Sequence, residues 1–272
     1  MMVRIYIPLT ILFLFFAELW AQKTEYGLPR QEKNLLRIAS YNILFQNNKS
    51  EEISKMILRN NSDIVLILEY NGYNIELDSL QAIGYRIHVS HPRFNPGGIA
   101  LIAQESIHLE GSLLPSPVDG SCSMPLVVAR VQCRYGNFAV IGIHAPPPFH
   151  RCKNQTYSML TAVAGWIFDG KLICDVGKAK RGDPVILLGD FNTASFNPVL
   201  DVFASSGLKD AYAEHHYFSM GTWSPVQWML PVFRIDFIYI SNNLISANAW
   251  HDNIPGSDHS GVIADILFER KL

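Results

Sequence analysis

The sequence has no excess of charge of either sign. Its 22 basic and 24 acidic residues leave a formal net charge of −2 over 272 residues, so composition predicts no bulk attraction to nucleic acid or to an anionic membrane. Only 17% of the residues are charged while 49% are hydrophobic, which excludes an intrinsically disordered chain. The glycines and prolines follow no period, which excludes collagen-like and low-complexity proteins.

Cysteine is scarce, and none occurs in the first hundred residues. This excludes a lipid-modified cysteine near the N-terminus. The four cysteines, Cys122, Cys133, Cys152 and Cys174, are too far apart for a CxxC metal site. In an oxidising compartment they would form one or two disulfides. Buried free thiols are the alternative, and the spacing leaves both open.

An apolar segment at the N-terminus predicts export. Arg4 precedes an apolar run over residues 5–20, and a cleavage site follows at Ala21. The run is shorter than the ~20 residues that a membrane-spanning helix needs. We therefore predict a signal peptide over 1–21, with an uncleaved anchor as the alternative, and a polar linker over 22–34. The protein is expected to be periplasmic or secreted, or else anchored to the membrane by this segment.

Short apolar runs alternate with amphipathic segments along the rest of the chain, which predicts one mixed α/β domain over 35–272. A helix is expected over 50–59, and a second helix begins with Asn154 as its cap. The runs at 63–68 and 184–189 look alike and each precedes a carboxylate, which indicates either two related halves or two unrelated buried strands. The other predicted strands cover 36–44, 98–103, 126–133, 138–144, 234–240 and 262–268.

Polar side chains with catalytic or metal-binding chemistry lie at the ends of these apolar runs. A buried carboxylate is costly unless it pairs or binds a cation. A single acid of this kind is more often a cap or an ion-pair partner, but its recurrence at strand after strand predicts a shared site. The candidate residues are Asn42, Glu69, His144, Asp190, Asn192, Asp236, Asp258 and His259.

These residues lie in motifs that resemble the endonuclease/exonuclease/phosphatase superfamily. The motifs are SYNIL (40–44), Glu69, GDFN (189–192), RIDFI (234–238) and GSDHS (256–260), in that order. The resemblance implies a deoxyribonuclease I-like fold, which is an α/β (α+β) four-layer sandwich of two mixed β-sheets flanked by helices. It also implies a site at one end of the sandwich and hydrolysis of phosphate esters with a divalent cation, Mg²⁺ or Mn²⁺.

The resemblance assigns the cation to three oxygen-bearing side chains. Glu69 would be the main metal ligand, supported by Asn42 and Asp258. Leu44 stands where many nucleases of the superfamily carry a second acid, which weakens the case for a nuclease. We expect a monomer that acts on a phosphate ester, with nucleic acid as a disfavoured substrate.

The catalytic roles are assigned in the same way. Asp190 would position or deprotonate the attacking water, while Asn192 and His144 would contact phosphate oxygens. Asp236 would orient His259 and favour its charged form. Whether Asp190 or the Asp236–His259 pair accepts the proton stays open.

Two further motifs resemble a bacterial envelope subgroup that includes teicoplanin-resistance type proteins. They are HAPPP (144–148) and GTW (221–223), and Pro231 ahead of the RIDFI motif adds to the resemblance. The resemblance implies a cell-envelope substrate that can be lipid-linked, and contact with a membrane surface. The apolar segment 223–233 would then be an exposed lip, with burial in the core as the alternative. The basic residues between 171 and 181 would be either a solvated loop or a phosphate-facing patch.

A non-catalytic binding module on a decayed phosphoesterase fold is the competing function. A decayed site loses its acids first, and here every acid of the set is present. The complete set favours the enzyme.

Overall fold

The computed structural model describes residues 35–119, 122–134, 136–148, 152–170, 183–217, 220–225 and 230–268. The predicted signal peptide and linker, the basic residues between 171 and 181, Cys174 and Trp228 lie outside these ranges. Among the helices of the described ranges, none combines the length and the apolar character needed to cross a membrane.

The described chain contains twelve β-strands. The strands are β1 (Leu35–Asn42), β2 (Ile64–Leu68), β3 (Tyr85–His91), β4 (Ile99–Gln104), β5 (His108–Leu114), β6 (Leu126–Cys133), β7 (Gly136–His144), β8 (Val185–Asp190), β9 (Leu208–Asp210), β10 (Asp236–Ser241), β11 (Leu244–Asn253) and β12 (Ser260–Phe268). The helices are α2 (Ser50–Asn60), α3 (Leu77–Gln81), α4 (Lys153–Phe168), the 3₁₀ turn η1 (Pro198–Leu200) and α6 (Asp201–Ser205).

The strands form two six-stranded sheets with the same pattern of pairing. Their orders are β11-β12-β1-β2-β4-β3 and β5-β6-β7-β8-β10-β9. In each sheet only the two central strands, β1 with β2 and β7 with β8, run parallel. Strands β2 and β8 therefore occupy equivalent positions, as expected if the two similar apolar runs belong to related halves.

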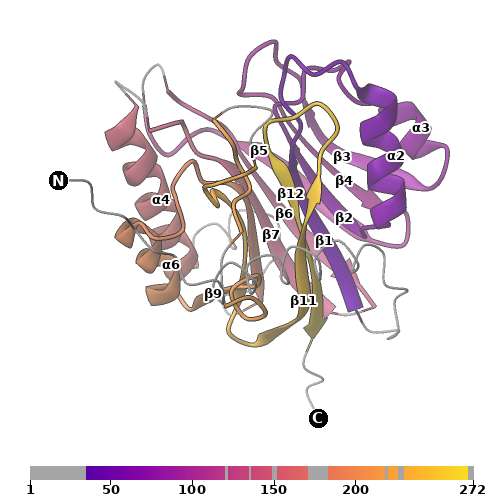
Figure 1. Cartoon of the computed structure of the whole chain (residues 1–272). Coiled ribbons are helices and arrows are strands. Elements are labelled where there is room, and N and C mark those ends of the chain that lie inside the picture. Colours follow the sequence, from indigo (N-terminus) through magenta and orange to yellow (C-terminus); the bar gives the residue numbers. More distant parts are fainter. Residues whose placement is uncertain are drawn as a thin grey trace, which may run out of the picture. The chain divides into compact units, whose positions relative to one another are not determined.

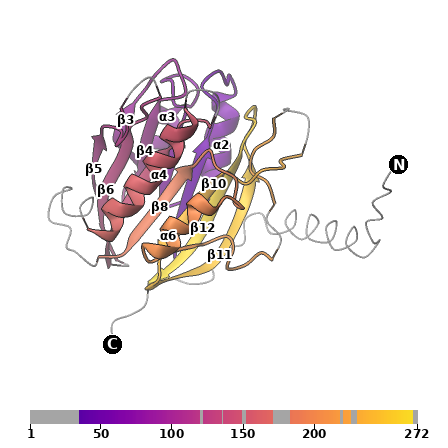
Figure 2. The same cartoon turned by 90° about the vertical axis from the view of Figure 1, so that its left-hand side faces the viewer.

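Helices cover the outer face of each sheet (Figures 1 and 2), with α2 and α3 on one side and α4 and α6 on the other. Leu66 of β2 packs with Val140 and Leu188 in the core between the sheets. Ile57 of α2 packs on the outer face of the first sheet, and Leu160 of α4 on that of the second. Strand β2 is buried along its whole length because it has a layer on both faces. The predicted four-layer sandwich is confirmed.

The structure contains four strands that the sequence did not predict, β3, β5, β9 and β11, and two further details differ from the predictions. Strand β10 begins at Asp236 rather than at 234, because the amides of Ile235 and Asp236 donate to Thr222 Oγ1 at 3.0 and 3.1 Å instead of to a neighbouring strand. Asn154 does not cap its helix. Helix α4 begins at Lys153, one residue after Cys152, which a disulfide ties to Cys122.

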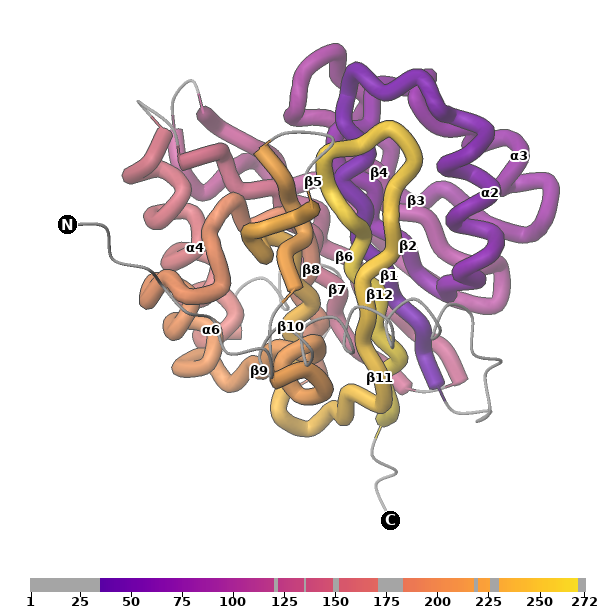
Figure 3. Tube along the Cα trace, viewed as in Figure 1, coloured from indigo at the N-terminus to yellow at the C-terminus, as the bar shows by residue number. Residues whose placement is uncertain are grey.

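The strand directions bring the chemistry-bearing residues to one end of the sandwich, here called the site end. Asn42 and Leu68 are paired at the ends of β1 and β2. In the other sheet His144 is paired with Asp190, and Asp190 with Asp236 at the start of β10. The loop after β1 and the turn between β11 and β12 meet at this end, which is uppermost in Figures 1 and 3. The opposite end is called the far end.

Candidate active site

One carboxylate oxygen lies at the centre of the site. Asp190 Oδ2 is 3.1 Å from the side-chain nitrogen of Asn42, 3.5 Å from His144 Nε2 and 3.8 Å from His259 Nε2. The side chain is only 1% exposed. Burial and the nearby charge of Asp236 raise the pKa of Asp190 to about 6, against the opposing pull of the two histidines. The group can therefore exchange a proton near neutral pH, as a general base must.

Glu69 lies directly beside this centre. Asn42 donates to Glu69 Oε1 at 3.1 Å and to Asp190 Oδ2 at 3.1 Å, so one amide joins two carboxylates from the two sheets. The backbone N–H of Phe45 donates to Glu69 Oε2 at 3.0 Å. Asn42 was predicted as a metal ligand, but it presents its amide nitrogen to the carboxylates, while its oxygen accepts from the Leu44 amide.

Asp236 and His259 form the predicted pair. His259 Nδ1 lies 2.9 Å from Asp236 Oδ2, and both side chains are buried. Burial would lower the pKa of His259, but its hydrogen bond and attraction to Asp236 and the charges of Asp190 and Asp258 outweigh it and raise the pKa to about 10. The imidazole therefore carries a positive charge at neutral pH and points its other nitrogen towards Asp190.

Asp258 lies at the margin of the site rather than in its centre. Its Oδ2 accepts from the Trp223 indole at 2.9 Å, while Oδ1 is buried with no hydrogen-bond partner among the described residues. Asn192 donates from its side chain to the carbonyl of Ala145 at 2.8 Å, and its backbone N–H donates to Asp190 Oδ1 at 2.8 Å. The structure thus brings together all the predicted residues, with Asp258 and Asn192 in supporting positions.

The backbone is strained at several residues in or beside the site. Glu69 and Asn192 have φ values of 60° and 47°, in the left-handed region that residues with a Cβ seldom adopt. Gly189 has φ of 141°, and a Cβ there would lie 1.8 Å from the carbonyl oxygen of Ile143. Glycine in GDFN is therefore required for β8 to approach β7 and place Asp190. Such strain is concentrated at functional sites in proteins.

The donor set fits a hard divalent cation. Glu69 and the orphan oxygen of Asp258 each offer a carboxylate oxygen of the kind that Mg²⁺ and Mn²⁺ prefer. Atoms of Asp190, Asp236 and His259 also lie within 4.8 Å of one another. A histidine must be neutral to bind a metal, and the raised pKa of His259 disfavours that second set. The Glu69 side is therefore the better cation site.

The sequence predicted an apolar lip from residue 223 onwards, but it did not show that residues 222–224 hold the strands of the site in place. The hydroxyl of Thr222 accepts two amides at the start of β10, and the Trp223 indole binds Asp258. The Ser260 amide donates to the Thr222 carbonyl at 2.6 Å. These hydrogen bonds join the segment to the starts of β10 and β12 and so position Asp236 and His259. The GTW motif was visible in the sequence, but nothing there showed which strands it joins.

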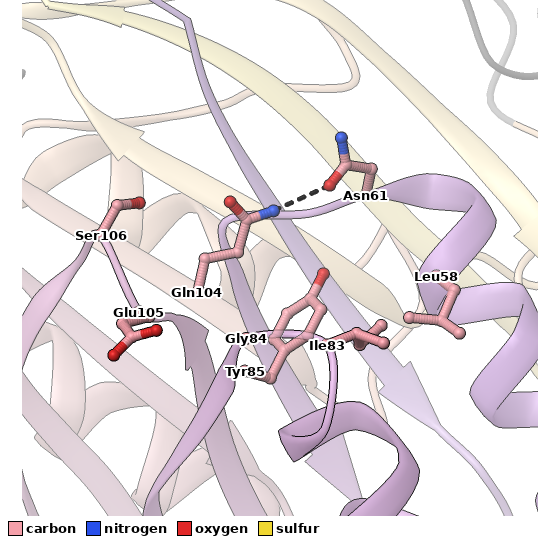
Figure 4. A pocket seen from close by; sticks show the side chains of 8 residues that line it. All are labelled: Leu58, Asn61, Ile83, Gly84, Tyr85, Gln104, Glu105 and Ser106. Atoms are coloured by element: carbon pink, nitrogen blue, oxygen red, sulfur yellow. Dashed lines mark hydrogen bonds between the residues drawn. The ribbon is translucent and has the colours of Figure 1, made fainter.

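Two of the grooves lined by described residues lie outside this centre. One, of 440 Å³, is at the far end, where Gln104 donates to Asn61 at 2.8 Å (Figure 4). Its other lining residues are Leu58, Ile83, Gly84, Tyr85, Glu105 and Ser106, none of which is a predicted site residue. The other groove, of 580 Å³, is at the site end between edge strands β3 and β5 and includes His91, Arg93 and Leu114.

Comparison with known proteins finds one family and several similar structures. The sequence model of the endonuclease/exonuclease/phosphatase family matches residues 39–259. No curated protein matches the chain significantly. A family protein from Bacteroides thetaiotaomicron is similar in structure, with a TM-score of 0.66 and 20% identity over 86% of this chain and 98% of that one.

Two structures of stated activity or ligand are similar to the same degree. The human nocturnin catalytic domain with bound sulfate has a TM-score of 0.65 and 21% identity, and the match covers 86% of this chain and 95% of that one. A mannosyl-6-phosphatase from Bacteroides thetaiotaomicron has a TM-score of 0.62 and 20% identity, with 86% and 100% covered. At these identities the likeness establishes the deoxyribonuclease I-like fold. The family match establishes more: the chain belongs to the endonuclease/exonuclease/phosphatase family, whose members hydrolyse phosphate esters.

Proposed function

We propose that this protein hydrolyses a phosphate ester with the help of Mg²⁺ or Mn²⁺ and that its substrate is a lipid-linked phosphate of the cell envelope. The observation that carries the hydrolysis is the position of Asp190 Oδ2. It is a buried carboxylate oxygen between an amide and two imidazoles, beside a second carboxylate. No structural role requires so many polar groups from five strand ends to converge.

Glu69 would be the main ligand of the cation, with Asp258 as a second carboxylate, and the cation would neutralise charge on the phosphoryl oxygens. Asp190 accepts the proton of the attacking water, because its pKa of about 6 leaves it ionised at neutral pH. His259, charged through its pairing with Asp236, donates to a phosphoryl oxygen as negative charge develops. His144 provides a second donor on the same side of Asp190.

The lipid-linked substrate rests on other observations. The HAPPP and GTW motifs resemble the envelope subgroup, and the N-terminal segment predicts export. In the described part of the segment 223–233, Leu230 and Val232 are 63% and 53% exposed. The exposure of these two side chains favours an apolar surface segment over burial in the core.

The test is a comparison of Glu69→Gln with Glu76→Gln. Glu76 is an exposed carboxylate in the same loop, so its variant is a matched control. With Mg²⁺ or Mn²⁺, Glu69→Gln should lose activity and cation binding without a change in melting temperature, while Glu76→Gln keeps both. Substrates should include a soluble phosphomonoester, a soluble diester, single-stranded DNA and a polyprenyl pyrophosphate. Full activity of the native protein in excess chelator would disprove the metal-dependent mechanism.

A further inference from the structure

Exposed apolar side chains are concentrated around the mouth of the site. Eleven large hydrophobic residues of the described chain are exposed. Six of them lie in four loops at the site end, covering 70–76, 92–98, 191–197 and 230–235. They are Tyr73, Phe94, Phe196, Leu230, Val232 and Phe233, and they are here called the rim.

The strand pairings place these loops together. The loop with Tyr73 follows β2, and the loop with Phe94 precedes β4, whose first residue is paired with the last residue of β2. The loop with Phe196 follows β8, and the loop with Phe233 precedes β10, whose first residue is paired with Asp190. Each rim loop therefore borders a strand end that carries a predicted catalytic or metal-binding residue or is paired with a strand end beside one.

Three of the rim side chains make ring contacts. The rings of Tyr73 and Phe94 stack with centroids 6.1 Å apart, although each residue is 77% exposed. Phe233 stacks on Trp223 at 6.3 Å, and the Trp223 indole binds Asp258 of the site. The apolar surface is thus linked to the active centre by direct contact.

The four rim loops carry almost no charge. Their exposed charged residues are Glu76 and Arg93, one of each sign, while Arg234 is buried in an ion pair with Asp210. A polyanion such as a nucleic acid would be expected to meet clustered cations. Aromatic and aliphatic side chains without net charge are instead suited to the boundary between lipid headgroups and acyl chains.

We propose that the rim docks on the surface of a lipid bilayer and presents the active centre to phosphate groups of membrane lipids. This inference rests on the proposed function, since it supplies the reason why that site would act on a lipid-linked ester. Each aromatic side chain that enters the interface contributes by burial of apolar area. Docking should therefore depend weakly on salt and on anionic lipid.

The experiment measures hydrogen exchange of the full-length protein with and without phosphatidylcholine vesicles. Amides of the four rim loops should exchange several-fold more slowly with vesicles, and amides at the far end should not change. The Phe94→Ser/Phe196→Ser variant should lose this protection. Phe168→Ser is the matched control, because Phe168 is 67% exposed at the end of α4, at the far end, and it should behave as the native protein.

Hydrolysis provides an independent comparison. The rim variant should lose about tenfold or more in rate on a vesicle-borne lipid phosphate, with unchanged kcat/KM on a soluble ester. Unchanged exchange in the rim loops would overturn the docking proposal even if the protein hydrolyses esters. Protection of the rim that depends on protein concentration without vesicles would overturn it in favour of self-association. Absence of hydrolysis on every ester would overturn the proposed function instead, because the exchange measurement does not require turnover.

Discussion

Replacing Asp236 by Asn should change the charge state of His259 more than any other single substitution. The native pair is 2.9 Å apart and buried, and it keeps the pKa of His259 at about 10. Asn fills the same space but removes the negative charge, so the burial that disfavours the imidazolium is no longer balanced by its main partner. We expect the pKa to fall by several units towards the ordinary value of about 6.5.

The consequence at a working pH follows from these values. At pH 8 the native imidazole is about 99% charged, whereas a histidine with a pKa of about 6.5 is about 3% charged. If the imidazolium donates to the phosphate, activity at pH 8 should fall about 30-fold, and the deficit should shrink as the pH is lowered. Asp236 also helps to raise the pKa of Asp190, so the acidic limb of the pH–rate profile should move to lower pH.

Two measurements check this prediction. Imidazole resonances in the metal-free protein give the pKa of His259 directly, and pH–rate profiles with saturating Mg²⁺ give the effect on catalysis. Asp265→Asn is the control, because Asp265 is a buried acid paired with Arg37 at 2.7 Å, away from the site end. Asp265→Asn should lower the free energy of unfolding without shifting either limb of the pH–rate profile. An imidazole that still titrates near pH 10 in Asp236→Asn, or an unchanged profile, would refute the assigned pairing.

Three further predictions concern the supporting structure. Asn42→Ala removes the amide between Glu69 and Asp190, so cation affinity by calorimetry should fall about 10- to 100-fold; native affinity would contradict that role. Burial lowers the pKa of His251 well below its ordinary value. The unfolded protein therefore binds a proton at His251 that the folded protein does not, and the free energy of unfolding decreases as the pH falls below 6.5. In denaturant titrations between pH 5 and 6.5, His251→Phe should reduce this pH dependence by up to about 1.4 kcal/mol per pH unit. If the free energies of unfolding of the variant and the native protein changed equally with pH, this role of His251 would be contradicted. Cys122→Ser opens a bridge with a sequence separation of 30 and should lower the free energy of unfolding by about 3–4 kcal/mol. A variant as stable as the native protein would show that this disulfide contributes little.

The fold could be predicted from the sequence where burial on both faces imposes a continuous apolar run. Strands β2 and β8 were recognisable for this reason, and the terminal carboxylates that follow them marked the site. Strands β3, β5, β9 and β11 were not predicted, because β9 has only three residues and the other three are partly exposed, with apolar residues interrupted by polar ones. The helix α4 was expected, but its first residue depends on the disulfide at Cys152 rather than on a cap at Asn154.

The candidate site likewise has features that the sequence predicts and features that only the structure shows. The amino-acid sequence by itself determined which residue types are available, since carboxylates, amides and imidazoles recur at the ends of one apolar strand after another and a buried charge is costly unless it pairs or binds a cation. Only the tertiary structure decided their relations: that Asn42 joins Glu69 to Asp190, that Thr222 holds the start of β10, and that Trp223 binds Asp258. These contacts connect residues from different strands and from both sheets. They arise from sheet packing and strand register, which bring distant segments within hydrogen-bond distance and leave no local pattern in the sequence.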